Sequence, residues 1–324
     1  MNSIAKTILD PIIIRYLKHF RSLGRQFYAE ERMLQSLRIF LIRNKQHDLD
    51  SSLFDKWSSS FEMLSANVRR ARQRIVRNFC LYRQRTESQC FVPDIYRFAR
   101  PQPCAAPVIL TPAQILKLLQ LADECPSNAH TSLLPKVLKV AIVLLYTAGL
   151  RRGELLRLTL SDVSEKTGIL RVRESKFHKS RLVPLSIDAR REVRCYLKHR
   201  LAPNLDITPT SSFLCNFSRG QRGYTGVGLG GAIRRLLLRG SIRDADGRVP
   251  RIHDFRHTFA VHALLRWYRQ GADVQSNLPK LALYMGHVSI VSTAYYLRWI
   301  PEIQELASNR FADKFGYLIQ GGDI

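Results

Sequence analysis

The sequence has no apolar run long enough to cross a bilayer. The best one, Val137 to Tyr146, is interrupted by Lys139, whereas a membrane-spanning helix needs about 20 apolar residues. Near the N-terminus, the run from Ile12 to Ile14 is followed at once by Arg15, which is not the pattern of a signal peptide. We therefore predict a cytoplasmic protein that has no membrane partner.

Cysteines are few and acidic residues are scarce. The six cysteines show no paired metal-ligand spacing, so we expect free thiols in a reducing compartment. The 26 Asp and Glu residues offer no convincing cluster of carboxylates, which argues against a metal-dependent transposase. We expect a protein that works without a metal ion or another cofactor.

Basic residues, by contrast, are abundant. The chain holds 51 Lys and Arg residues against 26 Asp and Glu, a formal net charge of +25. Each phosphate that a basic side chain neutralises releases condensed counterions, so this charge predicts a polyanionic partner. A surface that serves only solubility is the simpler explanation, but the excess runs through both halves of the chain.

The length and the hydrophobic pattern predict two domains. The chain has 324 residues, and 45% of them are hydrophobic, enough to bury a core. Residues 1–98 have the apolar periodicity of helices, and three prolines between Arg100 and Pro107 indicate an extended linker. We place a helical domain at 1–98, the linker at 99–107 and a second domain at 108–324.

A helix predicted at about residues 62–85 carries a series of arginines. Its apolar positions face a small core, and the basic side chains lie between them: Arg69, Arg70, Arg72, Arg74 and Arg77. Such arginines can contact a phosphate backbone or only solvent. With this charge balance we favour phosphate, and we predict these five as DNA contacts.

The second domain has the pattern of a mostly helical fold with one small β-sheet. Helices are expected at about 135–147, 187–200, 227–239 and 253–270, and two strands at 169–173 and 181–185. The glycine-rich run 223–231 lacks the Gly-Lys-Ser/Thr ending of a nucleotide-binding loop. The fold class is therefore mainly α with a small sheet.

Two basic segments are candidates for phosphate contact. Gly149-Leu150-Arg151-Arg152-Gly153-Glu154 ends one helix and begins another, and an arginine at such a bend can hold two oxygens of one phosphate. The turn between the predicted strands contains Lys176 and Lys179, followed by Arg181. A lysine there can protonate a leaving alkoxide, although the same pattern is typical of an exposed hairpin tip.

Two further segments carry histidines. His253 and Arg256 are three residues apart and share one helix face, so both can contact one phosphate. His253 and His257 are spaced i, i+4, but no glutamate stands beside them as in the zinc-protease motif. Farther along, Tyr296 lies nine positions after His287, and a tyrosine among cations and imidazoles can attack a phosphodiester.

Together these segments resemble the tyrosine recombinase (phage integrase) family over roughly residues 108–310. The resemblance assigns the catalytic set as Arg151, Lys176, His253, Arg256, His287 and the nucleophile Tyr296. Gly153 stands where serine is common, and Met285 where leucine is common, but neither position supplies a reacting group. Tyr295 is a neighbouring candidate, because only one of the two tyrosines can face the phosphate; the spacing favours Tyr296.

The resemblance implies a site-specific recombinase or integrase that acts through a 3′-phosphotyrosyl intermediate. Arg151 and Arg256 would hold the phosphate oxygens, Lys176 would protonate the leaving 5′-oxygen, and neither ATP nor metal would be consumed. Residues 1–98 would be a core-binding domain that clamps DNA.

It also implies an assembly and a biological setting. Strand exchange would need four protomers on double-stranded DNA, with or without sister recombinases, for integration or transposition of a mobile element at the nucleoid. A C-terminal helix, Pro301 to Phe315, would pack on a neighbouring protomer or on its own domain. The alternatives are a type IB topoisomerase-like enzyme and a non-catalytic DNA-binding relative.

Overall fold

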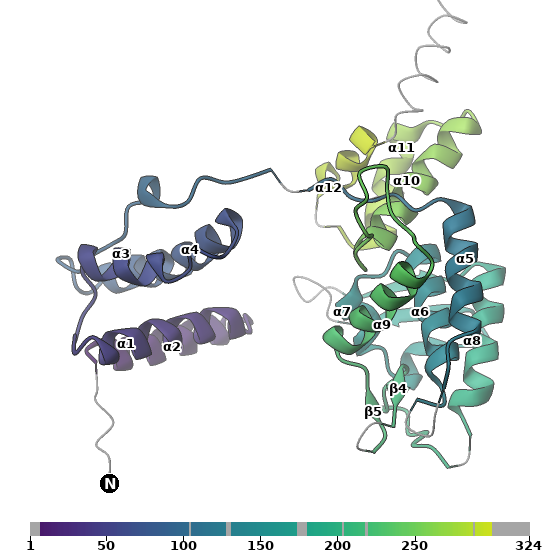
Figure 1. Ribbon diagram of the computed structural model, residues 1–324, viewed down its shortest axis with the longest axis horizontal. Coiled ribbons are helices and arrows are strands. Elements are labelled where there is room, and N and C mark those ends of the chain that lie inside the picture. Colours follow the sequence, from purple (N-terminus) through teal and green to yellow (C-terminus); the bar gives the residue numbers. More distant parts are fainter. Residues whose placement is uncertain are drawn as a thin grey trace, which may run out of the picture. The chain divides into compact units, whose positions relative to one another are not determined.

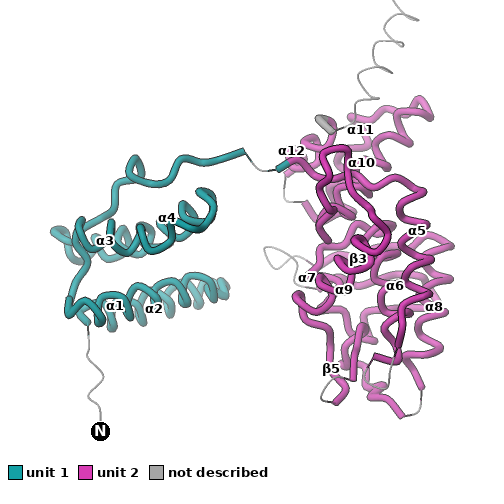
Figure 2. Tube along the Cα trace, viewed as in Figure 1, with its two compact units in different colours: residues 1–105 teal, residues 106–324 magenta. Residues whose placement is uncertain are grey.

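The chain folds into two compact units, residues 1–105 and 106–324 (Figure 1, Figure 2). The boundary falls inside the segment 99–107 that the prolines mark as a linker. The structure is a computed structural model, and it describes residues 7–103, 105–127, 131–173, 180–202, 204–217, 220–287 and 289–299.

The first unit is helical, as its apolar periodicity predicts. Its helices are α1 (Leu9–Ser22), α2 (Tyr28–Arg43), α3 (Ser51–Ser59), α4 (Ala66–Gln84) and the short 3₁₀ helix η1 (Ile95–Arg97). They share one core, in which Leu37, Trp57 and Phe79 are almost completely buried. The helix expected from about residue 62 begins only at Ala66, because residues 60–63 form a turn.

The first part of the predicted linker belongs to this unit. Asn67 donates a hydrogen bond to the carbonyl of Gln102 at 2.8 Å and accepts one from its amide at 2.9 Å. The Gln73 side chain accepts from the amide of Ala99. Residues 99–102 are therefore held against α4.

The second unit consists mainly of helices, shown from blue to yellow in Figure 1. They are α5 (Pro112–Asp123), α6 (Leu134–Thr147), α7 (Arg152–Arg157), η2 (Leu160–Asp162), α8 (Ile187–Arg200), α9 (Gly226–Arg239), α10 (Asp254–Arg269), α11 (Val274–Met285), α12 (Val291–Ala294) and η3 (Tyr295–Trp299). Thr111 begins α5 with a capping box, and its hydroxyl accepts from the amide of Gln114. Helix α6 packs against α5, α8 and α10 and forms the centre of the core.

The described residues contain two small sheets. Strands β1 (Val163–Ser164), β2 (Ile169–Val172) and β3 (Arg181–Pro184) form an antiparallel sheet, with Ile169 opposite Pro184 and Val172 opposite Arg181. Strands β4 (Cys215–Asn216) and β5 (Arg222–Gly223) form a separate antiparallel pair. The expectation of a single sheet built around two strands was therefore incomplete, because β1, β4 and β5 are only two residues long.

A second apolar cluster joins α10 to the last described helices. It includes Leu264, Leu281, Met285 and Tyr296, and it brings η3 against α10. Residues separated by more than 30 positions in the chain therefore meet at one place. None of the helices among the residues that the structure describes is long and apolar enough to cross a membrane.

Candidate active site

The site is built at a sharp bend between α6 and α7. Gly149 adopts a left-handed conformation with φ of +57°, and a Cβ there would lie 2.5 Å from Cδ1 of Phe259. Only glycine fits both requirements. The bend places Arg151 directly before α7, where its side chain is about one quarter exposed.

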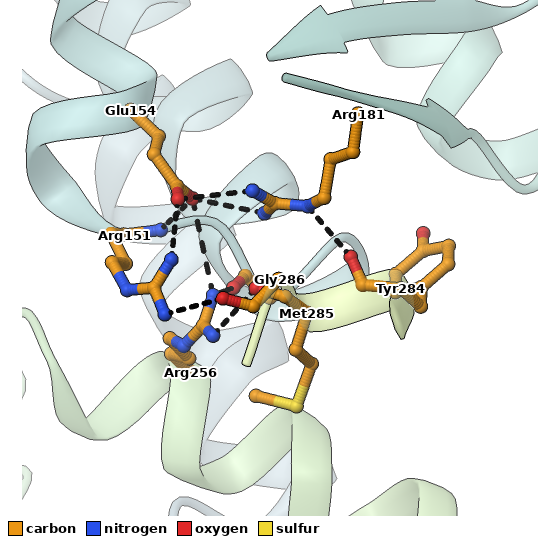
Figure 3. Close-up of polar contacts among 8 residues, drawn as sticks. Arg151, Glu154, Arg181, Arg256, Tyr284, Met285 and Gly286 are labelled. Atoms are coloured by element: carbon orange, nitrogen blue, oxygen red, sulfur yellow. Dashed lines mark hydrogen bonds and ion pairs between the residues drawn. The ribbon is translucent and has the colours of Figure 1, made fainter. Parts of the chain in front are cut away.

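Glu154 is the buried carboxylate at the centre of this region (Figure 3). It accepts from the backbone amide and the guanidinium of Arg151, at 2.9 and 2.7 Å. On its other side, two guanidinium nitrogens of Arg181 donate to it, each at 3.0 Å. The carboxylate thereby fixes two arginines that come from different elements, the α6–α7 bend and β3.

Three arginines converge on the carboxyl end of α11 (Figure 3). Arg181 donates to the carbonyl of residue 284 at 2.8 Å, Arg256 to that of residue 285 at 2.7 Å, and Arg151 to that of residue 286 at 2.9 Å. Arg256 also donates to the carbonyl of Gly149 at 2.6 Å. The end of α11 carries partial negative charge, so it favours these cations.

The cluster has an excess of positive charge. It contains three guanidinium groups and one carboxylate, that of Glu154. Nη1 of Arg256 lies 3.9 Å from an oxygen of this carboxylate. Burial and the charge of Arg151 lower the pKa of Arg256 to about 10, so it remains a cation at neutral pH. Burial alone would raise the pKa of Glu154, but hydrogen bonds and charge from Arg181 and Arg151 lower it to about 2. An anion is the ligand that this cluster would attract.

Two histidines lie close enough to Arg151 and Arg256 to feel their charges. His253 immediately precedes α10, and desolvation and the charge of Arg256 lower its pKa. His287 follows the left-handed Gly286 that ends α11, and its Nδ1 lies 2.7 Å from the hydroxyl oxygen of Thr293. Burial and the charges of Arg256 and Arg151 lower the pKa of His287 to about 4.

The structure separates the two neighbouring tyrosines. Tyr296 is 3% exposed and its ring stacks on that of His287, with centroids 5.9 Å apart. Tyr295 is 37% exposed. Burial raises the pKa of the Tyr296 hydroxyl, and Arg256 opposes this shift through its charge and a hydrogen bond.

Five of the six predicted catalytic residues thus lie in or beside one region: Arg151, His253, Arg256, His287 and Tyr296. The sixth, Lys176, lies outside the described residues, as do Lys179 and the segment 301–315. No group of three or more His, Cys, Asp or Glu side chains among the described residues is placed to hold a metal ion.

The predicted DNA contacts have other partners in the structure. Arg181 is 9% exposed and bound to Glu154 and to the carbonyl of residue 284, so its guanidinium is occupied within the protein. On α4, Arg70 and Arg77 donate to backbone carbonyls, and Arg72 lies 4.4 Å from the ring centre of Phe61.

The two other arginines of that series differ from these. Arg69 is only partly exposed, whereas the side chain of Arg74 lies at the surface. DNA contact by the α4 arginines stays a prediction.

Two residues of the site carried no assigned role in the sequence. The sequence motif contains Glu154 without indicating its role, although the spacing Arg-x-x-Glu at a helix start places a carboxylate near the preceding backbone amide. Thr293, fully buried against His287, had no signal of its own.

Known proteins resemble this chain both in sequence and in fold. A sequence profile of the Phage integrase family matches residues 109–301. A putative integrase/recombinase y4rB of Sinorhizobium fredii is 31% identical over 299 residues, which cover 91% of this chain and 94% of the relative. The tyrosine recombinase XerC of Thermodesulfovibrio yellowstonii is 29% identical over 198 residues, which cover 59% of this chain and 58% of the relative.

A solved structure shows the same fold. The integrase of transposon Tn1549, in complex with transposon right end DNA, has a TM-score of 0.61 to this chain at 19% identity. The alignment covers 88% of this chain and 94% of that one.

Proposed function

The chain belongs to the phage integrase family of tyrosine recombinases, and on that premise we propose that Tyr296 attacks a phosphodiester of double-stranded DNA. The observation that carries the proposal is the burial of the Tyr296 phenol beside a cluster with three guanidinium groups and one carboxylate. The product of the attack is a 3′-phosphotyrosyl link, and a 5′-hydroxyl from a partner strand reverses it.

The arginines hold the phosphate. Arg151 and Arg256 use some of their five donors on the protein, and the remaining N–H groups bind the non-bridging oxygens. Glu154 and main-chain carbonyls already hold these guanidinium groups in place. The side chains therefore need to move little as negative charge grows on the phosphate in the transition state.

The histidines act as neutral groups. If the hydroxyl of Thr293 donates to Nδ1 of His287, the imidazole proton resides on Nε2 and is donated to a phosphate oxygen. His253 lies one turn before the buried Arg256 and accepts the proton of Tyr296 as the new bond to phosphorus forms. Lys176 protonates the leaving 5′-oxygen.

The nucleophile is tested with a nicked cognate site that traps the covalent adduct, in the presence of EDTA. The wild-type protein should form the adduct, and Tyr296→Phe should abolish it while DNA binding is kept. Tyr295→Phe is the matched control and should leave adduct formation intact. An adduct from Tyr296→Phe but not from Tyr295→Phe would move the nucleophile to residue 295, and adducts from both would refute the mechanism.

The role of Lys176 has a chemical test. Lys176→Ala should slow cleavage, because the 5′-alkoxide would leave without a proton. A substrate with a 5′-bridging sulfur needs no such proton and should restore the rate. Slow cleavage of the sulfur substrate would remove Lys176 from the role of general acid.

The setting of the reaction is part of the proposal. We infer a cytoplasmic protein at the nucleoid that serves a mobile element, with residues 1–98 as a clamp on DNA and four protomers, with or without sister recombinases, in the active assembly. A relative named integrase/recombinase and a transposon integrase of the same fold support this setting. Relaxation of arbitrary supercoiled plasmid would instead favour a topoisomerase.

A further inference from the structure

His257 lies between two groups of the proposed mechanism without having a role in it. It stands on α10 one turn after His253, with ring centroids 4.7 Å apart and an interplanar angle of 85°. Its other neighbour is Tyr296, whose ring centroid is 5.4 Å away at 65°. It also lines a cleft of about 540 Å³ together with Tyr295, Tyr296 and His287.

The imidazole of His257 has a buried nitrogen with no hydrogen-bonding partner. Nδ1 is shielded from solvent and makes no hydrogen bond within the described part of the chain. Burying a polar atom in this way costs free energy of folding, and such atoms in folded proteins call for an explanation. A phenylalanine would fill the same space at no such cost, so packing alone does not account for a histidine.

The neighbours of His257 keep its ring uncharged. Burial lowers the pKa of His257 to about 4; the nearby His253, Arg251 and Arg256 act in the same direction, and Asp254 acts against them. A neutral imidazole has one donor and one acceptor nitrogen. When Nε2 carries the proton, Nδ1 is an acceptor, and the phenol of the neighbouring Tyr296 is a donor.

We propose that His257 is a positioning residue for the nucleophile, and that its Nδ1 accepts a hydrogen bond from the hydroxyl of Tyr296 when DNA occupies the site. The proposal rests on the function proposed above. The hydrogen bond, with the edge-on ring contact, restricts rotation of the phenol and directs a lone pair of its oxygen toward phosphorus. No proton is transferred to His257: it holds the phenol before the attack, and as the bond to phosphorus forms the O–H turns toward His253, which accepts the proton.

The test compares two substitutions that differ in one property. His257→Phe keeps the ring and removes the acceptor, whereas His257→Asn places a side-chain oxygen where Nδ1 lies. In single-turnover adduct formation on a nicked cognate site, the Phe variant should be slower by a factor on the order of 100, because a misplaced nucleophile loses about that much. Its Tm should be unchanged or higher, and its Kd for DNA unchanged.

The Asn variant supplies the rescue. It should form the adduct within about tenfold of the wild-type rate, since the position of the acceptor is retained. His262→Phe is a control on the same helix: His262 pairs with the hydroxyl of Tyr146 and does not line the cleft, so its replacement should leave the rate of the folded protein unchanged.

The outcomes separate this inference from the proposed function. Adduct formation by His257→Phe at the wild-type rate would overturn the positioning role, as would an Asn variant no faster than Phe. A wild-type protein that forms no adduct would refute the proposed function itself. If the Phe variant does not fold, the rate of the Asn variant still decides, because an Asn rate near zero in folded protein contradicts the proposal.

Discussion

Replacing Glu154 by glutamine should destabilise the protein strongly, although the two side chains have nearly the same shape. The carboxylate is 1% exposed and accepts four hydrogen bonds from Arg151 and Arg181. In Glu154→Gln an amide group would face guanidinium donors, and the buried arginines would lose their negative partner.

The magnitude follows from the pKa of Glu154. The interactions lower it from 4.5 to about 2, and at about 1.4 kcal/mol per unit this corresponds to roughly 3 kcal/mol at neutral pH. Urea denaturation of wild type and variant at pH 7 measures the difference. Glu165→Gln is the matched control: Glu165 pairs with Arg194 at the surface, so its loss should cost less than about 1 kcal/mol.

The pH dependence gives a second, independent check. A carboxyl whose pKa is lowered by folding contributes its full stability above the unfolded value and loses it as the pH falls through the folded value. The difference between wild type and Glu154→Gln should therefore be constant down to about pH 5 and shrink between about 4.5 and 2. A difference below about 1 kcal/mol at pH 7, or one that persists unchanged in acid, would refute the reasoning.

Three further results are expected. Gly149→Ala should lower the free energy of unfolding, measured with urea, by more than about 2 kcal/mol, because a left-handed backbone and a 2.5 Å approach to Phe259 both oppose a Cβ. An unchanged free energy of unfolding would contradict this argument. Thr293→Val should slow adduct formation about tenfold, since His287 loses its partner, and an unchanged rate would contradict this. In NMR titrations His287 and His257 should remain neutral until about pH 4. The free energy of unfolding should therefore fall as the pH drops from about 6.5 toward 4, because the unfolded chain takes up these protons first. Titration midpoints of the two histidines near the ordinary value of 6.5 would contradict the effect of burial.

Much of the architecture could be predicted from the sequence because its signals are local. The apolar periodicity of α6, α8, α9 and α10 and the alternating residues of β2 and β3 depend on neighbours within a few positions. The short strands β1, β4 and β5 could not be found in this way, because two residues carry no period. Their pairing is decided by where the rest of the chain places them.

The site was predicted in part for the same reason. Motif spacing singled out Arg151, His253, Arg256, His287 and Tyr296, and the structure brings them to one region. The sequence could not show which arginine side chains are already bound to partners inside the protein. The charge of Arg181 is visible in the sequence, but its partners Glu154 and the carbonyl of residue 284 lie 27 and 103 positions away.

The end of α11 has a consequence for how this site can change during evolution. Three arginines are anchored on consecutive main-chain carbonyls, and every amino acid supplies the same carbonyl. The side chain at 285 can therefore drift, from the leucine common in the family to methionine here, without the loss of an acceptor. Gly286 is constrained differently, because its φ is +69° and a Cβ would lie 2.8 Å from the guanidinium of Arg181. A site held by main-chain carbonyls can retain its geometry while its sequence diverges. The percentage of identical residues then underestimates how similar two such sites are in structure.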